Sequence, residues 1–509
     1  IKITKMVKVK VQWGKEKFNN VELDETQDLS EFKGVLYSLT NVPNAKQKIL
    51  YKGSVLKDGV DLASLKIPDG AIFMLMGLAE ERKIQEPTKK TVFLEDLTPE
   101  ERSRILKEKT GEALPVGLVN MGNTCYMNAS LQCLKRINEF KDGVLKYKGG
   151  ALGDQFTGSL QRLIGRLETK GDAFMPFEFF NALTLMFPQF GEMVQKGLYK
   201  QQDADECFQN MLDVVYPHLQ YEDEEGDKYD LIDYLFRIEL EATLRNAENP
   251  DEEAEVKTEH LRKLPCIIDN QNNPINQLHE GIKIALEENI EKNSPSLGRM
   301  AQYHKYSKLK KLPPYLIVQK IRFMWKKAVE SAGTKATKAK ILRNVSFPRT
   351  LDVYDFCTDE LKKSLDNGRN YEKKLAEEKS QAAVDKFENY KKKLEAEGKM
   401  ISEDNKELYK KWKEEQKEEE IREHDETLYR KIGTGLETGN YELIAVLTHQ
   451  GRTSDSGHYV AWVHKKGEEW YKYDDDKVSE VKLDDVLNLR GGGDWHMAYY
   501  CIYRRIEIV

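Results

Sequence analysis

The 509-residue sequence has no apolar run of membrane-spanning length, no Cys-x-x-Cys pair and no excess of basic charge. Its most apolar run, Ala71–Ala79, is about half of the ~20 residues that a transmembrane helix needs, so no membrane association is expected. Residues Ile1–Lys10 lack the apolar core of a signal peptide. With 80 Lys and Arg against 86 Asp and Glu, the formal net charge is −6, which disfavours a general nucleic-acid binder.

The cysteines are too few and too scattered for a disulfide scaffold in a chain of this length. The absence of paired cysteines also argues against a zinc ribbon or a thioredoxin-type redox pair. We therefore expect a reduced, intracellular protein. The six residues are Cys125, Cys133, Cys207, Cys266, Cys357 and Cys501.

Residues 6–78 are predicted to form a small domain of strand, strand, helix and further strands. Alternation in Met6–Val11 indicates a strand with one buried face, and Asp28 can cap a helix that ends before Pro43. This is the β-grasp order, and the segment resembles ubiquitin itself, including the turn at Lys52–Gly59. Gly77-Leu-Ala-Glu stands where ubiquitin has its diglycine tail. The domain is therefore expected to dock onto a partner and not to be conjugated.

The rest of the chain divides into a charged linker, 79–114, and a larger folded region, 115–505. Within that region, residues 358–431 form a charged insertion, since 37 of the 70 residues from Leu361 to Arg430 are charged. Such a segment cannot bury a core alone. Its composition is compatible with one charged helix, a helical hairpin or a disordered insertion.

A turn followed by a helix is predicted around Cys125. Gly122 and Asn123 mark the turn, and Thr124 can cap the helix. Cys125 would then lie in the first helical turn, where unpaired N–H groups and the helix dipole favour a thiolate. A lone cysteine is more often a small buried apolar residue, which is our interpretation of Cys133 and remains an alternative for Cys125.

A candidate base lies far along the chain. A Gly- and Ser-rich loop leads into Gly457-His458, the next residues alternate like a strand, and a second strand ends at Asp474. Antiparallel pairing of these strands would bring Asp474 beside His458, where a carboxylate can fix the imidazole tautomer. The alternative is an exposed histidine beside an acidic surface turn.

These motifs resemble those of a known family. Residues 120–132 are similar to the cysteine box of the ubiquitin-specific proteases, 201–207 to their glutamine–aspartate segment and 457–475 to their histidine box. The match covers about 115–503. With the N-terminal domain, and with Val446–Arg452 and Gly491–His496, the resemblance is to the proteasome-associated branch. It implies an α+β protein: a β-grasp ubiquitin-like domain followed by a papain-like catalytic domain with thumb, palm and fingers.

The resemblance implies a role for each matched residue. Cys125 would be the nucleophile, His458 the general base and acid, Asp474 the orienting carboxylate, and Asn120 an amide donor to the oxyanion. Without the resemblance, Asn120 would be read as a turn-forming residue. The implied reaction is hydrolysis of the isopeptide bond after the C-terminal glycine of ubiquitin, so the chain is expected to be a cysteine-type deubiquitinase.

A diglycine tail needs a narrow polar channel, and four residues are expected to contribute to it. These are Gln201, Asp203, Tyr459 and Asp475. For Asp475 the alternatives are an acid that supports the catalytic site and an acid that simply faces water.

Two loops are expected to obstruct this channel until the enzyme docks on the proteasome, which predicts low activity alone. They are Trp325–Lys340 and Arg452–Ser456, the latter including Ser454. Ordinary hairpin loops are the alternative. By analogy with ubiquitin's apolar patch, the docking face of the N-terminal domain would include Leu50 and Leu75.

The implied partners are ubiquitin, ubiquitin chains and the 26S proteasome regulatory particle, with a free enzyme that is monomeric and found in cytoplasm and nucleus. No cofactor is expected, and no metal, because the fingers region 221–300 contains only Cys266 where many relatives carry paired zinc-binding cysteines. One alternative function is a catalytically weak or inactive proteasome adaptor that binds ubiquitin chains. Another is processing of a different ubiquitin-like modifier.

Overall fold

The computed structural model describes residues 6–40, 42–77, 114–149, 154–169, 171–222, 226–269, 275–326, 337–397, 405–453, 456–493 and 495–509. These residues fall into two compact units, one holding 6–77 and the other 114–509. The predicted linker 79–114 lies outside the described residues except for Leu114. Among the helices of the described residues, none is both long enough and apolar enough to cross a membrane.

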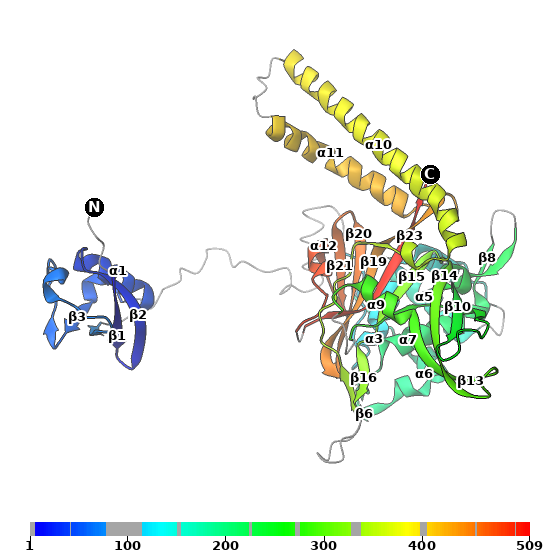
Figure 1. Ribbon diagram of the computed structural model, residues 1–509, viewed down its shortest axis with the longest axis horizontal. Helices are drawn as coiled ribbons and strands as arrows, with labels where there is room; N and C mark the ends of the chain where they lie inside the picture. The colour runs from blue at the N-terminus through cyan, green and yellow to red at the C-terminus, as the bar shows by residue number, and fades with distance from the viewer. Residues whose placement is uncertain are drawn as a thin grey trace. The chain divides into compact units, whose positions relative to one another are not determined.

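The N-terminal unit is the predicted β-grasp fold (Figure 1). Helix α1 (Leu29–Thr40) buries Leu29, Phe32 and Leu36 against a mixed five-stranded sheet. The sheet order is β2-β1-β5-β3-β4, with β1 and β5 parallel and the other pairs antiparallel. The strands are β1 (Met6–Trp13), β2 (Glu16–Asp24), β3 (Lys48–Tyr51), β4 (Ser54–Val55) and β5 (Ile72–Met76).

The outer face of this sheet differs from the predicted docking face at one position. Leu75 is only 1% exposed and lies in the core, because strand alternation turns its neighbours Met74 and Met76 outward. The prediction that Leu75 belongs to the exposed face is therefore wrong. Leu50 is half-buried and pairs with Met74 across β3 and β5. The exposed apolar side chains of this outer face are Met6, Val55, Ile72, Met74 and Met76.

A group of helices forms the thumb of the second unit. Helix α3 is buried on nearly every side and packs against α7 and the central sheet. Two short hairpins, β6–β7 (Met193–Gln195, Leu198–Tyr199) and β8–β9 (Gln220–Glu222, Lys228–Asp230), join the helices. The helices are α3 (Cys125–Lys135), α4 (Asn138–Lys146), α5 (Gln155–Leu167), α6 (Phe177–Met186), α7 (Ala204–Val215) and α8 (Leu231–Phe236).

The palm is a strongly buried sheet in the order β12-β15-β23-β19-β20-β21-β22. One face packs on the thumb helices, and the other on α9 (Leu278–Ala285) and α12 (Leu483–Leu487). A short strand, β18 (Thr350–Asp352), pairs with β19. The palm strands are β12 (Leu264–Cys266), β15 (Tyr315–Lys320), β19 (Leu436–Thr453), β20 (Ser456–Lys466), β21 (Glu469–Asp474), β22 (Lys477–Lys482) and β23 (Met497–Ile508).

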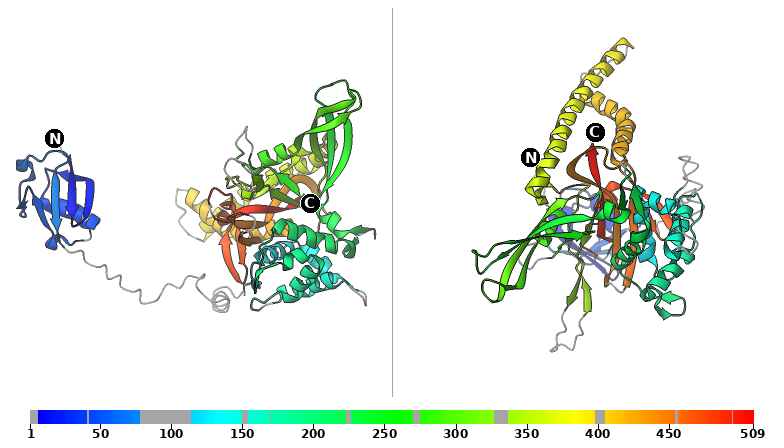
Figure 2. Two further views of the ribbon diagram at one scale, coloured as in Figure 1. Left: turned by 90° about the horizontal axis from the view of Figure 1, so that it is seen from below. Right: turned by 90° about the vertical axis from the view of Figure 1, so that its right-hand side faces the viewer.

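The fingers are a separate antiparallel sheet in the order β11-β10-β14-β13, and Figure 2 shows its long strands projecting from the body of the unit. Cys266 lies outside this sheet, on palm strand β12. Glu252, near the end of β10, accepts hydrogen bonds from Asn246, Ser294, Ser296 and Tyr303. This polar network ties together the ends of the fingers strands. The strands are β10 (Ile238–Asn246), β11 (Glu255–Leu261), β13 (Glu287–Ser294) and β14 (Arg299–Lys311).

Replacing Glu252 by glutamine is expected to loosen the end of the fingers. Hydrogen bonds from Ser294, Ser296 and Tyr303 lower the pKa of Glu252 to about 2. The network around the ionised carboxylate therefore stabilises the fold fully at pH values above 4.5, the ordinary pKa of this group. Its contribution is lost as the pH falls from 4.5 towards about 2. Amide hydrogen exchange in 246–252 and 294–303 should rise in Glu252→Gln. The neighbouring, exposed Glu253→Gln should exchange like the wild type; equal protection in both variants would contradict the role of Glu252.

The charged insertion forms two long helices, α10 (Asp359–Ala396) and α11 (Asn405–Leu428), which project together from the palm (Figure 1). Phe387 and Trp412 are buried between them, with Tyr409 packed edge-on against Phe387. Of the alternatives left open by composition, the described residues therefore form a helical pair, held by an aromatic contact between the C-terminal part of α10 and the N-terminal part of α11.

Candidate active site

The turn before Cys125 is built by Asn120. Its side-chain carbonyl accepts the backbone N–H groups of Gly122 (2.9 Å) and Thr124 (3.1 Å). Thr124 occupies the N-cap position of α3, as predicted, but its hydroxyl accepts the N–H of Met121 and makes no capping bond. The turn places Cys125 as the first residue of α3, with its N–H groups and positive dipole end.

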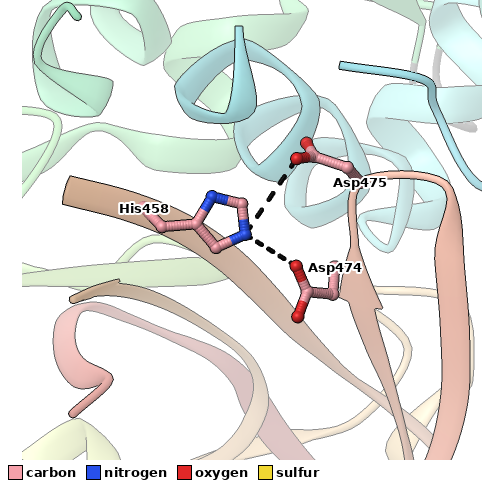
Figure 3. A group of neighbouring side chains, drawn as sticks. All are labelled: His458, Asp474 and Asp475. Carbon is pink, nitrogen blue, oxygen red and sulfur yellow. Dashed lines mark hydrogen bonds and ion pairs between the residues drawn. The ribbon is translucent and has the colours of Figure 1, made fainter. Parts of the chain in front are cut away.

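His458 and Asp474 meet as the predicted strand pairing requires. Strands β20 and β21 are antiparallel, and His458 Nε2 lies 2.6 Å from Asp474 Oδ1 (Figure 3). The other ring nitrogen of His458 points away from the carboxylates in this view. Burial raises the pKa of Asp474, but hydrogen bonds from His458 and Lys472 outweigh it and lower that pKa. Asp474 therefore remains ionised and holds one ring N–H.

Cys125 is 2% exposed, and its sulfur is one of the groups that act on the pKa of His458. The pKa of His458 is raised to about 10, mainly by its hydrogen bond with Asp474 and next by that with Cys125. The backbone N–H of Tyr459 also donates to Cys125 Sγ at 3.5 Å. A positively charged ring nearby and an N–H directed at sulfur are features typical of a cysteine nucleophile.

Asp475 was predicted to contact the ubiquitin tail, but the structure places it beneath the site. Its carboxylate accepts the side-chain amides of Asn120 and Asn128, each at 2.9 Å, and one oxygen lies 4.0 Å from His458 Nε2 (Figure 3). Burial raises the pKa of Asp475, against the two amide hydrogen bonds. Asp475 thus links the turn before Cys125, helix α3 and the histidine strand.

A cation site is conceivable only at the same place within the described residues. His458, Asp474 and Asp475 offer three ligand atoms that lie within 4.8 Å of one another. Their oxygens already accept N–H donors, and His458 Nε2 faces Asp474 with its own proton. The set fits a proton-holding acid–base group, so we assign no metal to it.

The other predicted tail residues occupy different environments. Asp203 caps α7 and accepts the hydroxyl of Tyr499 at 3.0 Å. The Tyr459 side chain is 1% exposed and packs against His449 and Tyr499, so it cannot line an open channel. Gln201 is 5% exposed and lies beside the cysteine, with Nε2 3.6 Å from Sγ.

The structure describes only part of the two predicted loops. Trp325 falls on β16 (Phe323–Lys326), which pairs with β17 (Thr337–Lys340), and Arg452 falls on β19, but their side chains lie outside the description. Ser454 is outside the described residues, and Ser456 is an exposed residue of β20. Lys340 is not a free loop residue.

Lys340 is 9% exposed, and its ammonium donates to His449 Nδ1 (2.8 Å) and to the His449 carbonyl (2.7 Å). Burial and this neighbouring charge lower the pKa of His449 to about 3. His449 is therefore neutral, and its Nδ1 can accept the hydrogen bond from the Lys340 ammonium.

Sequence reasoning missed Asn128 and His449. Asn128 had a usable signal, since a residue three positions after Cys125 shares its side of a helix. His449 had only the strand pairing of β19 with β20, which places it opposite Tyr459.

Comparisons with known proteins relate both units of the chain to known families. The sequence profile of the family "Ubiquitin carboxyl-terminal hydrolase" matches residues 116–503, and that of the "Ubiquitin family" matches 7–79. The chain is 38% identical to ubiquitin carboxyl-terminal hydrolase 6 of Arabidopsis thaliana, covering 98% of this chain and 99% of the relative. It is 33% identical to hydrolase 6 of Schizosaccharomyces pombe, over 99% and 100% of the two chains. It is 32% identical to hydrolase 14 of Caenorhabditis elegans, over 97% and 92%.

Proposed function

The chain belongs to the ubiquitin carboxyl-terminal hydrolase family and is a cysteine-type deubiquitinating enzyme. From this premise we propose that it hydrolyses the isopeptide bond after the C-terminal glycine of ubiquitin, and that Cys125, His458 and Asp474 carry out the reaction. The observation that supports the assignment most directly is the 2.6 Å pair between His458 and Asp474, next to a cysteine that opens a helix. A nucleophile, a base and an orienting carboxylate in this relation are sufficient for acyl transfer.

The mechanism follows from the proton positions. The Cys125 thiolate attacks the glycine carbonyl, and its electron pair forms the C–S bond while the carbonyl π pair moves to oxygen. Collapse breaks the C–N bond, and the His458 imidazolium gives its proton to the departing lysine amine. Water then attacks the thioester with His458 as base. Asp474 keeps the ring in one orientation throughout.

Ubiquitin carrying a C-terminal vinyl sulfone tests the proposal. The intact protein, with and without proteasome, should gain the mass of one ubiquitin, and Cys125→Ala should gain none. Cys133→Ala should react like the wild type, because Cys133 is fully buried eight residues further along α3. The same electrophile on another ubiquitin-like modifier tests the alternative substrate class.

An adaptor with little activity of its own is the second candidate, and the burial of Cys125 is the observation that favours it. It predicts no adduct under either condition, together with measurable binding of ubiquitin chains.

We also propose that the enzyme docks on the 26S proteasome regulatory particle through its ubiquitin-like domain and is activated there, in cytoplasm and nucleus. The support is the exposed apolar face of that domain and the near-complete sulfur burial, which implies a site that must open. The matched relatives share the whole length, including this domain.

Met74→Glu is expected to abolish most of the stimulation by proteasome, by about 10-fold or more, since a charge in the centre of an apolar contact costs over 1 kcal/mol. Tyr37→Glu is the matched control: both residues are 47% exposed, but Tyr37 lies on α1 and not on the sheet face. Turnover of a ubiquitin fluorophore conjugate is measured with and without proteasome. Equal wild-type turnover in both conditions would contradict activation, and equal stimulation of both variants would contradict docking through this face.

A further inference from the structure

The amide of Gln201 is buried against the sulfur of Cys125. Its Nε2 lies 3.6 Å and its Oε1 4.0 Å from Sγ, and the sulfur is the hydrogen-bond partner that the described residues give this side chain. A buried amide with so weak a partner is less stable than one that makes full hydrogen bonds. The position is therefore poorly explained by packing alone and is well suited to a group that receives a partner during the reaction.

The backbone around Gln201 is held firmly. Two residues later Asp203 caps α7, accepting the N–H of Asp205 at 3.0 Å, and its carboxylate also accepts the Tyr499 hydroxyl. These contacts fix the segment to both thumb and palm. The amide is consequently oriented before substrate arrives, which is what makes a donor effective in stabilising developing charge.

Asn120, the predicted oxyanion donor, is partly committed elsewhere. One N–H of its amide donates to Asp475 Oδ2, and its carbonyl holds the turn before Cys125. An amide has two N–H groups, so one remains for the oxyanion. A second side-chain donor would compensate for this limited capacity.

We propose that Gln201 is a catalytic residue that donates a hydrogen bond from Nε2 to the oxyanion of the tetrahedral intermediate. The inference rests on the proposed hydrolase function. The oxyanion is bonded to the carbon that Sγ attacks, so it forms close to Sγ. A donor nitrogen 3.6 Å from Sγ can therefore come within the ~2.7–3.1 Å of the oxyanion oxygen that a hydrogen bond requires. Asn120 and the backbone N–H of Cys125 complete the set of donors. This assigns Gln201 to the reacting atoms and not to the ubiquitin tail.

Two other roles would use the same contact. Gln201 could hold the thiolate, in which case its loss would change the reactivity of Cys125 towards small electrophiles. It could also bind the ubiquitin tail in the ground state, in which case its loss would weaken ubiquitin binding and leave kcat unchanged. The three roles therefore separate by measurement.

The test compares Gln201→Met, which keeps the length and removes the donor, with Gln202→Met, whose amide donates to the Gln189 carbonyl and not to sulfur. For Gln201→Met we expect kcat on a ubiquitin fluorophore conjugate to fall about 10²–10³-fold, with the inhibition constant of ubiquitin aldehyde rising by a similar factor. The affinity of ubiquitin for Cys125→Ala should be the same with and without Gln201→Met. The rate of Cys125 alkylation by iodoacetamide should also be unchanged.

Each other result overturns the proposal. An unchanged kcat with weaker ubiquitin binding assigns Gln201 to the tail, and alkylation that falls in step with kcat assigns it to the thiolate. A kcat equal to that of Gln202→Met removes any role for the amide. Thermal unfolding shows whether Gln201→Met is folded, and Gln201→Glu, which keeps the shape but replaces the donor by an acceptor, serves if it is not. If the wild type itself fails to turn over the conjugate or to form the vinyl sulfone adduct, the hydrolase function fails, which is a distinct outcome.

Discussion

Cys125→Ala is expected to lower turnover of ubiquitin conjugates by about 10⁴-fold or more while leaving ubiquitin binding intact. The variant lacks the sulfur nucleophile, so the thioester intermediate cannot form. The catalysed reaction depends on that intermediate. Single-turnover hydrolysis of a ubiquitin fluorophore conjugate, with calorimetric titration of ubiquitin, measures both quantities. Retained turnover would contradict the assignment of Cys125 as nucleophile.

Cys133→Ala distinguishes chemistry from packing. Both cysteines are buried in α3, but burial is the cause that raises the pKa of the Cys133 thiol, which favours its neutral form. Its replacement should cost about 1 kcal/mol of stability and leave kcat within a factor of about two. Cys125→Ala is therefore expected to change turnover, whereas Cys133→Ala is expected to change stability.

Asp474→Asn is expected to lower kcat about 10²–10⁴-fold, because an amide neither fixes the same tautomer nor stabilises the imidazolium of His458. Asp476→Asn, two residues away on the same turn, is the matched control and should remain near wild type. Steady-state kinetics at neutral pH measure the difference, and equal losses in the two variants would contradict a specific role for Asp474.

The same substitution should change the pH profile in one direction. The hydrogen bond to Asp474 is the largest cause that raises the pKa of His458 from 6.5 to about 10. The protonated ring is therefore retained until the pH rises towards 10. Without the carboxylate, the proton is lost at lower pH. The alkaline limb of kcat/KM should move towards neutrality in Asp474→Asn and stay in place in Asp476→Asn.

Local patterns in the sequence were sufficient for the features that depend on neighbouring residues. The β-grasp order follows from alternating strands and one amphipathic helix, and the meeting of His458 with Asp474 follows from two strands joined by a short turn. Both are determined by periodicity and chain direction. The family resemblance then supplied the distant partner, Cys125, which no periodicity could have placed beside His458.

Other features depend on contacts that local patterns do not encode. The run Ile72–Met76 is apolar throughout, so nothing in it shows which residues face the core, and Leu75 was assigned to the wrong side. Lys340 looked like a polar loop residue because its acceptor, His449, lies 109 positions away. Asp475 was assigned to the ubiquitin tail because the two asparagines whose amides it accepts are far from it in the sequence.

The position of β23 within the palm has a consequence for the biosynthesis of the enzyme. This strand follows every other palm strand in chain order, yet it lies between β15 and β19 in the middle of the sheet. Until it has left the ribosome, β15 and β19 lack their shared neighbour, and the palm sheet is divided into two separate groups of strands. The nascent chain can therefore carry both Cys125 and His458 and still be unable to cleave ubiquitin, and activity should arise only when synthesis of the catalytic domain is complete.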